Sequence, residues 1–398
     1  MNESKLWTKD FLIDTIANFL LLLAHFMPLV TIAVYAADHY QTSPSQTGLV
    51  AGIYIIGVLF GRNFAGNLID RTGRKKTLYI GVSFFLITTL LYFAVTNSLL
   101  LLYLVRFLNG AGFGIAATAT STIVANIIPI ARIGEGTGYY AMSTAIASAI
   151  GPFVAMLIIE KASFHMVLVL ATISIVICLI IVVFLKVPEA KFTQEQLDAS
   201  KKWSVENFLE LSAMPIAIVA FFMGVAIGPV LQFLSSYVRA IDLVDVGSFF
   251  FLVYALAMVI SRTFTGRLFD QKGENFVMYP SLFLFALGLI TLGIAHQRLV
   301  FLLAAVFIGV GYGTFFSSGQ ALAIKLCQKH RTGLAISNFF CFLDFGVGLG
   351  IIILGLLIPL TGFRGIYVCV GVVVISCIVL YYFLYNKKSN NHCLTAGL

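Results

Sequence analysis

Charged residues are scarce in this chain. Of its 398 residues only 11% are charged, whereas 60% are hydrophobic. The core of a soluble domain cannot bury such a large share of apolar side chains. This composition excludes an ordinary soluble protein and indicates that a lipid bilayer surrounds most of the chain.

Patterns typical of enzymes and of metal sites are also missing from the sequence. The six cysteines include no C-x-x-C pair, and none lies in a predicted outer loop, so neither a disulfide framework nor a metal site is predicted. No Ser/His/Asp set or phosphate-binding loop is present. We therefore expect no enzyme activity and no cofactor, and an ion gradient rather than ATP as the energy source.

What the chain does have is a series of apolar segments long enough to cross a bilayer as helices. Six precede a polar stretch and six follow it, and the first segment is followed by no cleavage site for a signal peptide. The sequence thus predicts an all-α membrane protein of 12 transmembrane helices in two pseudo-symmetric halves. The predicted parts are an N-terminal six-helix bundle (1–185), a cytoplasmic linker (186–212), a C-terminal six-helix bundle (213–386) and a cytoplasmic tail (387–398).

Most of the 25 lysines and arginines fall at the N-terminus, in the even-numbered loops, in the linker and in the tail. Loops rich in these residues stay in the cytoplasm, so both termini are predicted to be cytoplasmic. The net charge of +8 is then a topology signal, and no nucleic-acid partner is expected.

A charged, glycine-flanked segment occurs twice, at 66–76 and again at 266–273. We interpret it as a loop that latches two helix bundles on the cytoplasmic side and releases them as they rock, as in transporters built from repeats. The alternative is a plain positively charged loop. The gate residues that we predict are Gly66, Asp70, Arg71, Gly73, Arg74 and Asp270, together with Glu135 before the fifth span.

Buried charges that occur in only one half are candidates for function, because ionisable groups inside a membrane are expensive. Asp344 is aligned with Ala145 and Arg106 with Ala305. Asp344 is a plausible proton carrier, or alternatively a permanent ion-pair partner. Arg106 stays charged, so it can pair with a carboxylate or bind an acidic substrate; alternatively it extends toward the outer surface.

Two further unduplicated groups, Asp14 and His25, share one helix face with Asn18. His25 titrates near neutrality when unperturbed, although a structural hydrogen bond is an alternative. Asp14 can equally be an acid suited to a helix N-terminus. We assign Asp344, Arg106, His25 and Asp14 to proton coupling, and Asn18, Asn109, Gln232 and Tyr237 to the lining of the substrate path.

The segment G-x-L-x-D-R-x-G-R-K-K resembles the signature loop of the major facilitator superfamily. Residues 102–114, which include Arg106, resemble its fourth-helix motif. Gly138 and the pair Gly151-Pro152 resemble the fifth-helix motif of drug/proton antiporters, with alanine replacing two glycines. Glu135 resembles the acid that docks near the signature loop. These resemblances imply a twelve-helix, proton-coupled exporter of the drug-antiporter type, with Gly138, Gly151 and Pro152 as helix-packing residues.

The sequence therefore predicts a monomeric exporter that exchanges protons for a small-molecule substrate in a bacterial cytoplasmic membrane. An importer or symporter of the same fold and a non-transporting sensor or scaffold are the alternatives. Substrate identity stays open among cations, sugars and anionic metabolites, because Asp344 suits a cation and Arg106 an anion.

Overall fold

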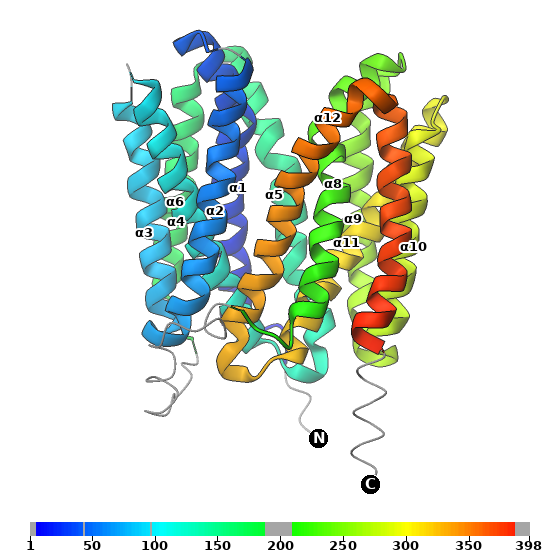
Figure 1. The fold of residues 1–398 in the computed structure, drawn as a ribbon. Coiled ribbons are helices and arrows are strands. Elements are labelled where there is room, and N and C mark those ends of the chain that lie inside the picture. Colours follow the sequence, from blue (N-terminus) through cyan, green and yellow to red (C-terminus); the bar gives the residue numbers. More distant parts are fainter. Residues whose placement is uncertain (1–4, 43, 96–97, 188–208, 387–398) are drawn as a thin grey trace. The chain divides into compact units, whose positions relative to one another are not determined.

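The computed structural model consists of helices and short connections (Figure 1), and it describes residues 5–42, 44–95, 98–187 and 209–386. Within these residues, 11 helical stretches are long and apolar enough to cross a bilayer. This confirms the predicted all-α membrane architecture. The helices are α1 (Lys9–Tyr40), α2 (Pro44–Thr72), α3 (Arg74–Leu91), α4 (Leu99–Ile127), α5 (Ile133–Lys161), α6 (Phe164–Val183), α8 (Met214–Ala240), α9 (Val244–Lys272), α10 (Glu274–Gly293), α11 (Arg298–Leu326) and α12 (Thr332–Tyr381).

Helix α12 is too long to be a single span. Its 50 residues would extend about 75 Å at 1.5 Å per residue, more than twice the thickness of the hydrocarbon core. Gly362, with φ 66° and ψ 172°, is not helical, and the chain reverses its direction within α12 (Figure 1). Helix α12 thus consists of two helices that meet at Gly362.

The chain forms two compact units, which do not coincide with the two halves of the sequence. The N-terminal unit comprises Met1–Pro129, Ser143–Glu210 and Gln328–Ser337. The C-terminal unit comprises Ile130–Met142, Leu211–Cys327 and Asn338–Leu398. Each unit therefore includes the first turns of one helix whose remainder belongs to the other unit. The predicted linker and tail lie largely outside the described residues.

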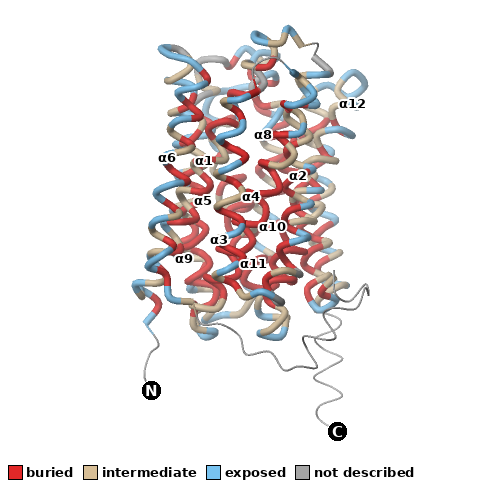
Figure 2. The backbone as a smooth tube through the Cα atoms, turned by 90° about the vertical axis from the view of Figure 1, so that its left-hand side faces the viewer, coloured by how far each residue is buried: buried red, intermediate tan, exposed pale blue. Residues whose placement is uncertain are grey.

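Within each unit, glycines allow pairs of helices to pack closely. A Cβ atom added at Gly110 of α4 would lie 2.2 Å from the Tyr54 carbonyl oxygen of α2. In the C-terminal unit, a Cβ at Gly309 of α11 would lie 2.5 Å from the Tyr254 carbonyl oxygen of α9. Lipid tails are as apolar as the side chains that they replace, so this close packing, rather than burial alone, stabilises the helix pairs. Figure 2 shows that helices carry both buried and exposed positions along their lengths.

The duplicated charged segment is a helix break at a single glycine, whereas the sequence predicts a short loop. Helix α2 continues through 70 and 71 to Thr72, and α3 begins at Arg74. Only Gly73 leaves helical geometry, with φ 93°, and Gly273 does the same between α9 and α10 with φ 86°. Charged residues prolong a helix without strain, whereas a positive φ favours glycine. The backbone at 70 and 71 thus belongs to the last turn of α2.

Candidate functional site

Polar side chains of the N-terminal unit gather along one face of α1. Asn18 is buried, and its amide nitrogen donates a hydrogen bond to Ser143 Oγ at 2.8 Å. Its amide oxygen accepts a bond from Thr120 Oγ1 at 3.4 Å. These bonds join α1 to α4 and to the part of α5 that follows Met142. Asn18, predicted to line the substrate path, therefore forms part of a helix junction.

Asp14 lies one turn before Asn18 and has 0% exposure. Neither of its carboxylate oxygens has a hydrogen-bond partner among the described residues. Other residues cap the N-terminus of α1. The Thr8 hydroxyl accepts a hydrogen bond from the Phe11 amide at 3.2 Å, and Asp10 is the acid of the first turn. Asp14 is therefore not explained by the helix terminus. An ionised carboxylate is expensive in such a place unless it is paired.

His25, two to three turns further along α1, lies among aromatic side chains. Its Nδ1 is 2.7 Å from the Tyr54 hydroxyl of α2. Its ring stacks on Phe113 of α4, with centroids 4.1 Å apart and planes 9° apart. His25 is partly exposed, whereas Tyr54 and Phe113 are buried. The predicted titratable group on α1 is thus held by one hydrogen bond and one stacked ring.

Arg106 joins the same cluster from α4. Its guanidinium carbon lies 4.3 Å from the centre of the Tyr54 ring, an arrangement that favours a cation. Its Nε donates to the Val50 carbonyl oxygen at 3.0 Å, whereas Nη2 has no partner among the described residues. With 1% exposure the side chain does not extend outward, so that alternative is wrong. Arg106, Tyr54 and His25 form a continuous contact.

The buried Arg262 of the C-terminal unit differs from Arg106 in its hydrogen-bond partners. Arg262, the counterpart of Arg62, donates from Nε to the Gly313 carbonyl oxygen at 3.3 Å and from Nη1 to the Ala141 carbonyl oxygen. These backbone contacts agree with a packing role. Asp344 of α12 is partly exposed and lies within electrostatic reach of Tyr312. The Asp344 side chain is thus less buried than that of Asp14.

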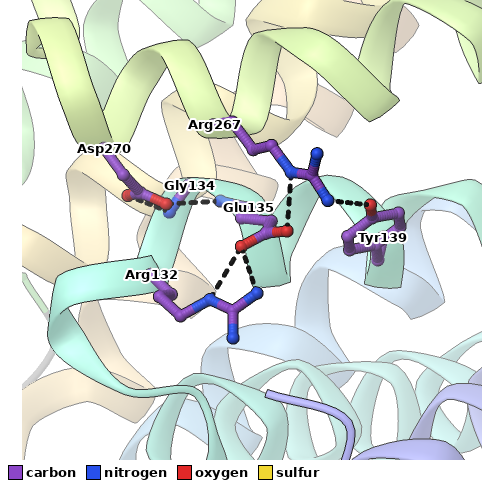
Figure 3. A network of polar contacts seen from close by, with 6 residues as sticks. All are labelled: Arg132, Gly134, Glu135, Tyr139, Arg267 and Asp270. Atoms are coloured by element: carbon purple, nitrogen blue, oxygen red, sulfur yellow. Dashed lines mark hydrogen bonds and ion pairs between the residues drawn. The ribbon is translucent and has the colours of Figure 1, made fainter. Parts of the chain in front are cut away.

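A charged network connects the first turn of α5 to the end of α9 (Figure 3). Asp270 accepts hydrogen bonds from the backbone amides of Gly134 at 2.7 Å and Glu135 at 2.8 Å. It therefore caps the N-terminus of α5, where unpaired amides and the helix dipole favour an anion. The Glu135 carboxylate pairs with Arg132 at 2.6 Å and with Arg267 at 2.9 Å. Two of the predicted gate residues, Asp270 and Glu135, thus meet in one network.

The signature glycines lie at equivalent contacts in the two units. A Cβ at Gly66 would be 2.8 Å from Ser337 Cβ, at the start of α12, and a Cβ at Gly266 would be 2.5 Å from the Gly134 carbonyl oxygen. Ser337 Oγ also donates to the Arg62 carbonyl oxygen at 2.7 Å. The Arg74 side chain is buried. The side chains of Asp70 and Arg71 lie outside the described part.

Three residues predicted to line the substrate path lie in different surroundings. Asn109 is buried, and its amide donates to Thr88 and Thr89 of α3 at 3.1 and 3.0 Å. Tyr237 has 0% exposure, and its hydroxyl donates to the Leu292 carbonyl oxygen at 2.7 Å. Both polar groups serve helix packing. Gln232 is exposed and stays a prediction.

The fifth-helix residues lie at close contacts. A Cβ at Gly138 would be 3.1 Å from the Arg262 carbonyl oxygen, and a Cβ at Gly151 would be 2.8 Å from Phe26 Cβ of α1. Pro152 lies inside α5, where it removes one backbone donor. These positions agree with a packing role.

Sequence reasoning missed four participants. The chain has 16 tyrosines, and nothing in the sequence distinguishes Tyr54 and Tyr92 from the others as functional residues. Arg267 and Arg132 complete the charged network. For Arg267 a signal existed, because the aligned residue in the first half is Asn67.

Comparison with known proteins agrees with this architecture. The family model of the Major Facilitator Superfamily matches residues 15–292 and 244–393. The chain belongs to the Major Facilitator Superfamily. It is therefore a multi-pass membrane protein of a transporter family.

Among relatives of this superfamily member, an uncharacterized MFS-type transporter of Methanocaldococcus jannaschii is 24% identical over 84% of this chain and 87% of its own length. The staphylopine export protein of Staphylococcus aureus is 21% identical over 84% of this chain and 85% of its own. The solved structure of the proton:xylose symporter XylE has a TM-score of 0.77, 14% identity, and coverage of 97% and 96% of the two chains. This likeness shows the shared fold.

Proposed function

We propose that this superfamily member is a proton-driven exporter of small molecules in a bacterial cytoplasmic membrane. It acts as a monomer with twelve spans, counting the two parts of α12 separately, and with both termini in the cytoplasm. The distribution of lysine and arginine supports the orientation. The Gly151-Pro152 pair in α5 and the similarity to the staphylopine export protein of Staphylococcus aureus support export.

Asp14 carries this proposal. It is a fully buried carboxylate on α1, and neither oxygen has a hydrogen-bond partner among the described residues. A carboxyl group in such surroundings is far less costly when protonated than when ionised. We assign to Asp14 the binding of the transported proton in this state. A conformational change that brings water or a cation to Asp14 would release the proton.

The remaining coupling residues extend from Asp14 along α1. His25 is 11 residues further on, about 16 Å along the helix axis, and it contacts Tyr54, which lies under Arg106. This row of polar groups reaches from one end of α1 toward the middle of α4. Because no described contact bridges the distance from Asp14 to His25, we propose that protonation at Asp14 influences Arg106 only through a change of conformation of α1, not by direct contact. Asp344, partly exposed, takes a secondary place in this proposal.

The network around Asp270 is the proposed gate. Its carboxylate binds two amides at the start of α5, and these bonds to a charged acceptor are stronger than neutral ones. Asp70 occupies the equivalent position in α2, with Gly66, Arg71, Gly73 and Arg74 around it. We propose that both acids hold helix starts in one state of the transport cycle and release them in the other.

Infrared spectroscopy of the purified protein tests the proton site without a known substrate. A protonated carboxyl group has a carbonyl band that an ionised one lacks. We expect a band that persists at neutral pH in the wild type and is absent in Asp14→Asn, whereas Asp10→Asn retains it. Asp10 is the matched control because it lies one turn away and bonds to the Lys186 amide. A band that survives in Asp14→Asn would remove Asp14 from the mechanism.

A further inference from the structure

Two polar atoms of the N-terminal unit are buried without partners near the same place. Arg106 has 1% exposure, and its Nη2 makes no hydrogen bond to any described residue. Tyr92, at the end of α3, has 4% exposure, and its hydroxyl is likewise without a partner there. The hydroxyl and the Arg106 guanidinium face one another as polar neighbours, but their geometry falls outside that of an ordinary hydrogen bond.

The charge of Arg106 is not balanced by a described acid. Its Nε binds a backbone carbonyl and its plane lies against the Tyr54 ring, and it forms no ion pair with any described residue. A buried cation without a counter-ion is strongly unfavourable. Arg262 provides the contrast, because two backbone carbonyl oxygens occupy its nitrogens. Arg106 thus has a buried donor, Nη2, that bonds to no described acceptor, whereas Arg262 donates to two backbone carbonyl oxygens.

We infer that Arg106 and Tyr92 bind an anionic group of the substrate, and that the transported molecules are carboxylates. Arginine Nη2 and a tyrosine hydroxyl are two donors, and a carboxylate offers two acceptor oxygens. The inference rests on the proposed transport function and adds the substrate class. It resolves the opposing indications of the sequence in favour of the anion.

The surroundings suit an organic anion. Tyr54 covers one face of the guanidinium, and His25 and Phe113 continue the aromatic surface. His25 is the partly exposed member of this cluster. Such a surface can receive the apolar body of a carboxylate while its charged group binds Arg106.

The second half of the chain lacks the donor pair. The residue aligned with Arg106 is Ala305. The contacts of Gly112 with Phe85 and of Gly311 with Phe285 give an offset of 200 in this part of the chain, so Tyr92 is aligned with Leu292. Tyr254 in α9, the counterpart of Tyr54, is retained and buried. The shared tyrosine therefore belongs to the packing of both halves, and the anion site belongs to the N-terminal unit alone.

Thermal unfolding of the purified full-length protein tests this inference. The probes are acetate, benzoate, succinate and phthalate, each compared with its neutral amide at equal ionic strength. A ligand that binds the folded state raises its Tm. We expect at least one carboxylate to raise the Tm by about 2 °C or more, and its amide to leave the Tm unchanged.

Three variants locate the site. Arg106→Gln should abolish the carboxylate-dependent shift, and Arg106→Lys, which keeps the charge but loses the fork, should retain part of it. Tyr92→Phe should weaken binding about tenfold or less, whereas Tyr237→Phe, whose hydroxyl bonds to a backbone carbonyl, should not. Should Arg106→Gln fail to fold, the lysine variant and Tyr92→Phe carry the test.

The inference is overturned if no carboxylate stabilises the wild type, if the shift persists in Arg106→Gln, or if Arg106→Lys and Tyr92→Phe both show the full wild-type shift at every carboxylate concentration. Asp14→Asn separates this inference from the proposed proton site. It should lose its infrared band yet retain the carboxylate-dependent shift, because Asp14 is about 16 Å along α1 from the His25 cluster. If Asp14→Asn keeps both the infrared band and the carboxylate-dependent Tm shift, the proton site at Asp14 is refuted, whereas the inferred substrate class stands.

Discussion

Removal of the Asp270 carboxylate is the perturbation whose effect can be worked out most directly from the structure. In the Asp270→Ala variant the amides of Gly134 and Glu135 lose the carboxylate oxygens to which they donate at 2.7 and 2.8 Å. These are first-turn amides of α5, which have no acceptor within their own helix. Loss of a helix N-cap costs about 0.5–2 kcal/mol, and bonds to a charged acceptor lie toward the upper end of that range.

A loss of about 1–2 kcal/mol changes a local opening equilibrium by a factor of roughly 5–30. The Glu135–Arg267 pair should contribute less, because Arg267 is 60% exposed. Exposed ion pairs contribute about 0.2–1 kcal/mol. Moreover, Arg267 contacts the Glu135 side chain and leaves the backbone amides bound to Asp270. The Asp270 cap should therefore contribute more to the stability of the α5 N-terminus than the Glu135–Arg267 ion pair does.

Hydrogen exchange of the purified protein, read on peptides that cover 130–142, measures the effect. Exchange of the first α5 amides should accelerate roughly 5–30-fold in Asp270→Ala. In Arg267→Gln it should stay within about twofold of the wild type. Equal acceleration in the two variants, or none in Asp270→Ala, would refute the reasoning about the cap.

Three other predictions concern the remaining residues. Asp344→Asn should retain a larger share of gradient-driven transport than Asp14→Asn, because Asp344 is partly exposed; equal losses in vesicle assays would contradict this ranking. Gly266→Ala should lower thermal stability and monodispersity, because its Cβ would lie 2.5 Å from a carbonyl oxygen, whereas Gly348→Ala, with nothing within 4 Å, should not; similar melting of the two would argue against close packing. An impermeant thiol reagent on intact cells should leave Cys393 unlabelled, and ready labelling would reverse the proposed orientation.

The fold was predictable because its signals are local. Apolar runs, the duplicated glycines and the charged segment each follow from residue types at fixed spacing. The helix break was harder to predict, since the sequence around 70–73 suits a loop as well as a helix that ends at one glycine. Only the positive φ of Gly73 distinguishes the two.

The candidate site was only partly predictable. The comparison of the halves selected Arg106, His25 and Asp14, since an unduplicated buried charge can be recognised from the sequence. It did not select Tyr54 or Tyr92, because a tyrosine gains its role from the groups around it. For the same reason the sequence did not predict the hydrogen bonds of Asn109 and Tyr237, because their partners, Thr88 and the Leu292 carbonyl oxygen, lie on other helices.

Transport in inside-out vesicles with an imposed pH gradient tests the central claim most directly. The substrate is a carboxylate identified by its effect on the Tm, and uphill accumulation is compared with downhill exchange in wild type, Asp14→Asn and Asp10→Asn. The account predicts that Asp14→Asn loses uphill accumulation and keeps exchange, while Asp10→Asn retains both. Accumulation by Asp14→Asn against the substrate gradient at the wild-type rate would contradict it.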